Sequence, residues 1–114
     1  MQNANVTSNY YEGTLHFVLQ GEVDHHSAGA LREKMDEAIF FYRPKRVEID
    51  LGTLSFMDSS GLGLILGRYN RMQQLGGSLV LRNPTRDIEK ILRLAGVNRL
   101  IQIVQTDITE ETTQ

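Results

Sequence analysis

The chain contains no cysteine, which excludes disulfides, thiolate zinc sites and thiol nucleophiles. A composition without cysteine is compatible with a reducing compartment. Basic residues are not in excess either, because the sequence has 12 lysines and arginines and 14 acidic residues, which gives a net charge of -2. Proteins that bind nucleic acid usually carry a basic patch or stripe. We therefore expect no nucleic acid among the partners.

Long apolar runs are missing as well. No apolar stretch approaches the roughly 18 residues that a membrane-spanning helix needs. The first residues, MQNANVTSN, contain neither a basic start nor an apolar leader segment. The sequence thus predicts a cytoplasmic protein with no membrane among its partners.

The length of the chain restricts its organisation. A chain of 114 residues corresponds to one ordinary domain with little room for a second function. We expect a single domain over 1–114, in which 1–8 and 106–114 are fraying ends. The polar last residues, TDITEETTQ, either fray or form a short acidic helix.

The order of the predicted elements defines the fold class. Strands are expected at 5–11, 14–22, 46–51, 78–82 and 100–104, and helices at 27–41, 59–74 and 85–95. After the first hairpin each strand connects to the next through a helix, which implies parallel pairing with right-handed crossovers. The fold class is therefore α/β, with a small mixed sheet that is mostly parallel.

Three loops follow the carboxyl ends of strands in this order, at 24–27, 56–61 and 82–86. The carboxyl ends of parallel strands lie at one edge of a sheet, so we expect these loops side by side along that edge. Open α/β sheets bind their ligands there. We therefore expect the functional site at this edge.

The second of these loops opens the motif FMDSSGLGLILG at 56–67. On the helix that follows, the residues expected to form a buried stripe are Leu62, Ile65, Leu66, Tyr69 and Met72. Leu64 falls on nearly the opposite side of the helix, beside Arg68 and Arg71. We interpret Leu64 as either an isolated surface leucine or a contact for a partner.

The motif also contains Gly61, Gly63 and Gly67, each of which costs up to about 1 kcal/mol of helix propensity relative to alanine. We expect these glycines where the helix closely approaches the sheet or a neighbouring loop. A first chemical interpretation takes them as a dinucleotide-binding fingerprint, with Arg82 placed for a 2'-phosphate. Against it, the spacing G-x-G-x-x-x-G is one residue too long, and Asp58 occupies the turn that a pyrophosphate must approach. A nucleotide-binding or weakly nucleotide-hydrolysing domain that uses the same edge remains the alternative.

A second interpretation takes a serine of the motif as a catalytic nucleophile. The nucleophile elbow needs glycine where Met57 stands, and His16 belongs to a strand remote from the loop edge. His25 and His26 do lie on that edge beside Asp24, so the position alone does not exclude a base there. As metal ligands the two histidines lack a third partner at usable spacing, and we expect no metal site.

A third interpretation makes a serine of the motif the substrate of another enzyme. At a helix N-terminus, free N–H groups donate hydrogen bonds to a phosphate, and the positive end of the helix dipole favours its negative charge. The added charge of about -1.5 to -2 alters the surface that a partner meets. Asp58 or Ser59 also fits a plain helix cap, and capping is compatible with modification.

Three segments of the sequence together resemble STAS domains of the sporulation anti-sigma factor antagonists. They are GEVD at 21–24, VEIDL at 47–51 and FMDSSGLG at 56–63, in this order. The resemblance extends over 10–104, and D-S-S-G-L-G is its most specific part. It implies a small sheet with helices packed on one side.

The resemblance also implies a role for Ser59. In that family the serine directly after the aspartate is phosphorylated by an anti-sigma factor that is itself an ATP-dependent serine kinase. The unphosphorylated protein binds the anti-sigma factor and frees the sigma factor, and a serine phosphatase restores this form. We therefore expect a regulatory binding protein, not an enzyme, with Ser59 as its phosphorylation site.

The expected partner surface is the edge formed by the first two loops. Its predicted contact residues are Asp24, His25, Ser27, Asp58, Ser60, Gly61, Leu62 and Leu64. Asp24 is expected to be exposed, as a loop residue at a strand end. Asp58 is expected to cap the helix, and Gly61 to let the partner approach the turn.

Overall fold

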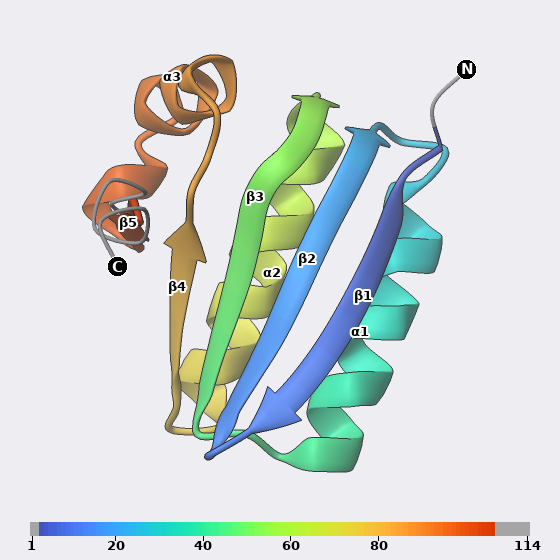
Figure 1. Ribbon diagram of the computed structural model, residues 1–114, viewed down its shortest axis with the longest axis vertical. Helices are drawn as coiled ribbons and strands as arrows, with labels where there is room; N and C mark the ends of the chain where they lie inside the picture. The colour runs from blue at the N-terminus through green and yellow to red at the C-terminus, as the bar shows by residue number, and fades with distance from the viewer. Residues whose placement is uncertain (1–2, 107–114) are drawn as a thin grey trace, which may run out of the picture.

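Five strands form one sheet in the computed structural model, which describes residues 3–106 (Figure 1). The strands are β1 (Asn5–Tyr11), β2 (Thr14–Val23), β3 (Arg46–Met57), β4 (Ser78–Arg82) and β5 (Gln102–Val104). The helices are α1 (Ala28–Tyr42), α2 (Ser59–Gln74) and α3 (Arg86–Leu94), followed by a single 3-10 turn, η1 (Val97–Arg99). The spatial order is β1-β2-β3-β4-β5, with β1 antiparallel to β2 and the other neighbours parallel. The predicted α/β class and mostly parallel sheet are confirmed.

Residues 5–8 belong both to the predicted strand at 5–11 and to the end expected to fray, and they pair with β2 as part of β1. Glu12 and Gly13 connect the two strands with positive φ angles of 54° and 80°, the backbone of a tight turn that matches the strand twist. The predicted end at 106–114 lies outside the described residues except for Thr106. None of the helices within 3–106 is long and apolar enough to cross a membrane.

β3 is longer than the sequence predicts. The pattern indicates an end at Leu51, but the strand continues to Met57, where it pairs with Val23 at the end of β2. In its second half the buried residues, Leu51, Leu54 and Met57, are spaced by three rather than by two. Two shifts in register with β2 accompany this spacing, so the strand does not show simple alternation. The extension carries β3 beyond β4, whose pairing with it ends at Asp50.

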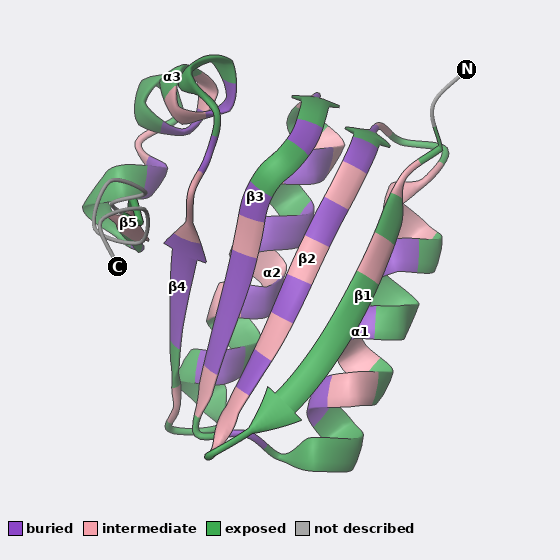
Figure 2. Ribbon diagram, viewed as in Figure 1, coloured by how far each residue is buried: buried purple, intermediate pink, exposed green. Residues whose placement is uncertain are grey.

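α1 and α2 cover one face of the sheet and leave the other face open (Figure 1). On β2 the alternation is as predicted, because Leu15, Phe17 and Leu19 are buried while His16 and Val18 are half-buried on the opposite side. Figure 2 shows this alternation along the strand. Burying one such large apolar side chain contributes about 1.5–3 kcal/mol. The layer between the sheet and these two helices is therefore the main source of stability.

A charged cluster occupies the open face of the sheet. Glu48 is buried, and it accepts hydrogen bonds from Arg46 Nε at 3.0 Å and Arg82 Nε at 2.8 Å, while His16 Nδ1 lies 3.3 Å from its carboxylate. Burial raises the pKa of Glu48, but the hydrogen bonds from Arg82 and Arg46 outweigh it and hold the pKa below its usual value. Arg82 is thus engaged by Glu48 and is not free for the 2'-phosphate of the dinucleotide interpretation.

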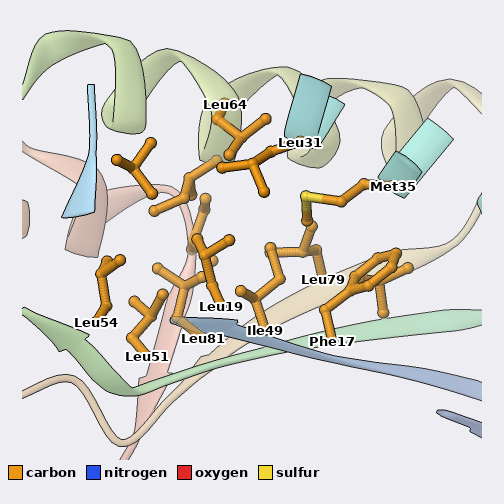
Figure 3. Packing of buried hydrophobic residues seen from close by; sticks show 14 of the residues in the cluster. Phe17, Leu19, Leu31, Met35, Ile49, Leu51, Leu54, Leu64, Leu79 and Leu81 are labelled. Carbon is orange, nitrogen blue, oxygen red and sulfur yellow. The ribbon is translucent and has the colours of Figure 1, made fainter. Parts of the chain in front are cut away.

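The packing of α1 against α2 contradicts the predicted exposure of Leu64. Leu64 is 5% exposed and belongs to the same apolar cluster as Leu31 of α1 (Figure 3). Arg68, predicted on the same exposed side, is 8% exposed, and its Nε lies 3.2 Å from Asp36 Oδ1 of α1. The helical pattern indicates which stripe faces the sheet, but it does not indicate that a second helix lies alongside.

The predicted core stripe of α2 is correct in part. Ile65 and Met72 are buried as predicted. The members that are only half-buried are Leu62, Leu66 and Tyr69. The buried face of α2 is therefore rotated toward α1, through Leu64 and Arg68.

Candidate functional site

The ends of β2 and β3 bring two of the predicted loops together. Val23 pairs with Met57, and the Asp58 N–H donates a 3.2 Å hydrogen bond to the Val23 carbonyl. The turns at 24–27 and 58–61 therefore lie side by side, at the upper end of the sheet in Figure 1. The third loop, 82–86, leaves β4 beside the middle of β3, so it does not extend this edge as predicted.

Asp58 is the N-cap of α2. Its backbone is extended, and its carboxylate Oδ1 accepts a 2.8 Å hydrogen bond from the Ser60 N–H. Its carbonyl oxygen accepts hydrogen bonds from the Gly61 and Leu62 N–H groups. A carboxylate at this position also complements the positive end of the helix dipole. Asp58 therefore caps the first turn of α2 with both its side chain and its carbonyl oxygen.

Ser59 is the first residue of α2 and is exposed. Within residues 3–106 its hydroxyl forms no hydrogen bond. Because Asp58 supplies the cap, the Ser59 hydroxyl is not required for holding the helix. Ser60 is half-buried, which leaves Ser59 as the more accessible hydroxyl of the motif.

Asp24 organises the neighbouring turn, and it is half-buried rather than exposed as predicted. Its Oδ1 accepts hydrogen bonds from the N–H groups of His26 at 2.9 Å and Ser27 at 3.1 Å. Partial desolvation raises the pKa of Asp24, but the hydrogen bonds from Ser27 and His26 outweigh it and lower the pKa. The spacing D-x-x-S is typical of such turns, and this signal was available in the sequence.

The two histidines of this turn are exposed, and their ring centroids lie 4.0 Å apart. Within the described residues no hydrogen bond joins either ring to Ser59 or Ser60. In the same part of the chain, no group of three histidine, aspartate or glutamate side chains is placed to hold a metal ion. Both histidines are therefore exposed surface residues of this turn.

Gly61 is buried, so the expected close approach of the helix to the sheet is confirmed at this residue, whereas contact of Gly61 with a partner stays a prediction. A Cβ atom at this position would lie 2.6 Å from Met57 Cβ and 3.1 Å from Met57 Sδ. At Gly63 and Gly67 a Cβ atom would meet nothing within 4 Å, so the predicted close approach is wrong for these two residues. Glycine is therefore required at 61 by packing inside the domain. Sequence reasoning missed Met57 as the residue beneath the turn.

The fold and the site together define a small α/β domain in which adjoining strand ends present a capped helix with an exposed serine. The sequence over residues 5–110 matches the family model of the STAS domain. The chain belongs to the STAS domain family.

Several relatives resemble the chain over most of its length. The anti-sigma F factor antagonist of Paenibacillus polymyxa is 34% identical over 93% of this chain and 91% of its own length. The solved structure of the anti-sigma factor antagonist SpoIIAA in its unphosphorylated form is 29% identical, with a TM-score of 0.78 over 95% of this chain and 93% of the other. The phosphorylated form of the Bacillus cell fate determinant SpoIIAA is also 29% identical, with a TM-score of 0.72 over 96% of this chain and 97% of the other.

Proposed function

We propose that this chain is an anti-sigma factor antagonist whose binding to its partner is switched off by phosphorylation of Ser59. The observation that carries the proposal is the state of Ser59, which is exposed at the start of α2 while Asp58 supplies the cap. The Paenibacillus polymyxa relative and the two solved forms of SpoIIAA support it. The chain then acts in the cytoplasm as a binding protein and as the substrate of a kinase, and it catalyses no reaction itself.

The proposed partner surface is the pair of turns at the ends of β2 and β3. Its contact residues are Asp24, His25, Ser27, Asp58, Ser60 and Leu62. Backbone hydrogen bonds to Asp24 and Asp58 fix both turns, so little conformational entropy is lost when a partner binds. Gly61 and Leu64 support this surface from inside the domain.

The proposed switch is local. The anti-sigma factor acts as a kinase that transfers the terminal phosphoryl group of ATP to Ser59 Oγ, and a serine phosphatase removes it by hydrolysis. The phosphate lies at the positive end of the α2 dipole, which favours its negative charge. The N–H groups of Ser60, Gly61 and Leu62 keep their hydrogen bonds to Asp58. The partner meets an added charge of about -1.5 to -2, close to the negative side chain of Asp58. Binding is therefore lost through charge and bulk while the fold persists.

Binding of Ser59 variants to the purified anti-sigma factor kinase of the same cell tests this proposal. Ser59→Ala is expected to keep binding in the presence of ATP, whereas the wild type loses binding as phosphate accumulates. Ser59→Asp is expected to bind weakly, although one carboxylate carries less charge than a phosphate. Ser60→Ala is the matched control and should behave like the wild type. Loss of binding by Ser59→Ala without ATP would contradict the proposed mechanism.

A further inference from the structure

A second surface lies at the opposite end of the domain, where α1 ends. Phe40 and Phe41 are 70% and 77% exposed there, on the last turn of the helix. This turn is at the lower end of α1 in Figure 2, where the ribbon is coloured as exposed. Single exposed apolar residues are common on proteins, whereas contiguous exposed apolar patches mark sites of interaction.

Tyrosines surround these phenylalanines. Tyr42 stacks on Tyr10 of β1 with ring centroids 4.7 Å apart, and Phe41 meets Tyr42 edge-on at 4.9 Å. Leu75, which follows α2, is 58% exposed and lines the same groove as Phe40, between the ends of α1 and α2. These side chains form one apolar end of the domain, which we call the aromatic end. It consists of Tyr10, Phe40, Phe41, Tyr42 and Leu75.

Cations accompany the aromatic end. Arg43 lies over the Phe40 ring at 5.5 Å, and Arg71 borders the groove between the two helix ends. Lys45 is held at this end by a hydrogen bond from its N–H to the carbonyl of Gly13 in the β1–β2 turn. Within residues 3–106 none of these three cations forms an ion pair. Lys34 and Glu37 line a hollow together with Phe40 and Phe41, and the exposed Glu12 directly precedes Gly13. The cations at this end therefore outnumber these carboxylates, although the chain as a whole has a net charge of -2.

We propose that the aromatic end docks on the surface of an anionic lipid bilayer. Protruding phenylalanines insert into the boundary between headgroups and acyl chains, where no complementary pocket is needed. Tyrosines are enriched at the level of the headgroups, and unpaired lysine and arginine side chains attract anionic lipids. This proposal departs from the expectation that no membrane is among the partners. That expectation depended on the lack of a long apolar run, which says nothing of a local cluster of aromatic and basic side chains.

The docked orientation is compatible with partner binding. The aromatic end adjoins the amino ends of β2 and β3, while Ser59 and the turn at 24–27 lie at their carboxyl ends (Figure 1). The switch surface would therefore point away from the bilayer. This proposal does not depend on phosphorylation of Ser59, so either proposal can fail without the other.

Co-sedimentation with lipid vesicles tests the inference. The unphosphorylated protein should sediment with vesicles of phosphatidylcholine and phosphatidylglycerol and remain in the supernatant with phosphatidylcholine alone. The double variant Phe40→Ser with Phe41→Ser should lower the partition coefficient by about tenfold or more, and Arg43→Glu with Lys45→Glu by a similar factor. Leu94→Ser and Lys90→Glu on α3 are matched controls, since Leu94 is 79% exposed, and both should sediment like the wild type.

Two results would overturn the inference. One is a wild-type protein that stays in the supernatant with anionic vesicles at low salt. The other is self-association in analytical ultracentrifugation that is lost in the Phe40→Ser, Phe41→Ser variant, with no binding to vesicles, which would assign the aromatic end to a second copy of the chain. Circular dichroism of each variant checks that the fold is retained. A variant that fails to fold is replaced by Phe41→Ser alone.

Discussion

On its inner face α2 presents Leu64, Ile65 and Met72 to the sheet and to α1, whereas on its outer face it presents Ser59 and Gly63 to solvent. The inner side chains fill the core layer, and Gly61 is confined there by Met57. On the outer face the Ser59 hydroxyl is unbonded within residues 3–106, and Gly63 faces open space. The same helix thus packs into the core with one face and exposes a serine hydroxyl with the other.

The difference explains how a modification can change binding without changing the fold. A phosphate on the outer face displaces no side chain that holds the core together. The cap of α2 comes from Asp58, so modification of Ser59 does not remove it. Substitutions on the inner face should therefore affect stability, and those on the outer face should affect binding.

Truncation of Leu64 is expected to have the largest effect. Leu64→Ala removes buried methyl groups between α1 and α2, and should lower the free energy of unfolding by about 2–5 kcal/mol in urea denaturation. Leu94→Ala is the matched control, because Leu94 is 79% exposed and its loss should change stability by less than about 0.5 kcal/mol. Equal effects of the two substitutions would mean that Leu64 is a surface residue, as the helical pattern predicts.

The two glycines Gly61 and Gly63 offer a sharper test on one helix. Gly61→Ala places a methyl group 2.6 Å from Met57 Cβ, and should lower the free energy of unfolding by about 1–3 kcal/mol. Gly63→Ala meets nothing within 4 Å and should raise it by up to about 1 kcal/mol through helix propensity. Thermal or urea unfolding measures both. Stabilisation by Gly61→Ala would contradict the packing of this turn on β3.

Asp24 is expected to contribute both to stability and to partner binding, and its substitution should change the free energy of unfolding less than that of Leu64 or Gly61. Asp24→Ala loses the acceptor for two backbone N–H groups and should lower the melting temperature slightly while weakening partner binding. Asp24→Asn keeps an acceptor oxygen and removes the charge, so it should retain more stability. If partner affinity falls equally in both variants, the negative charge of Asp24 contributes to binding. Unchanged affinity in both would restrict Asp24 to the fold.

Acidification provides a further check on the carboxylate. The folded-state pKa of Asp24 is lowered, so its contribution to stability is present above the unfolded pKa and is lost as the pH falls through the folded pKa. The stability difference between the wild type and Asp24→Asn should therefore shrink on acidification. Unfolding at neutral and acidic pH measures it, and a difference that grows in acid would contradict the hydrogen bonds assigned to this side chain.

The sequence was sufficient for the elements and their order, because helical and alternating apolar patterns are strong in this chain. It was insufficient where elements contact one another. Leu64 and Arg68 are buried by a neighbouring helix, a contact that periodicity within α2 does not encode. The extension of β3 to Met57 was missed because its register shifts break the alternation.

At the candidate site, too, local features could be predicted from the sequence, whereas contacts between elements could not. Asp58 and Ser59 were identified from local rules for helix starts and from the family resemblance, since capping depends on adjacent residues. The half-buried state of Asp24 was missed, although D-x-x-S is a local signal for the turn. The packing of Gly61 on Met57 depends on where β3 ends. The sequence pattern predicts an end at Leu51 rather than at Met57, so it does not place Met57 beneath this turn.

The identity of the phosphorylated serine is the most direct test of the account. The wild type, Ser59→Ala and Ser60→Ala would each be incubated with the purified anti-sigma factor kinase and ATP, and then measured by intact-mass spectrometry with fragmentation. If Ser59 is the phosphorylation site, the wild type and Ser60→Ala each carry one phosphate, located at Ser59, and Ser59→Ala carries none. Phosphate retained by Ser59→Ala and lost from Ser60→Ala would contradict it.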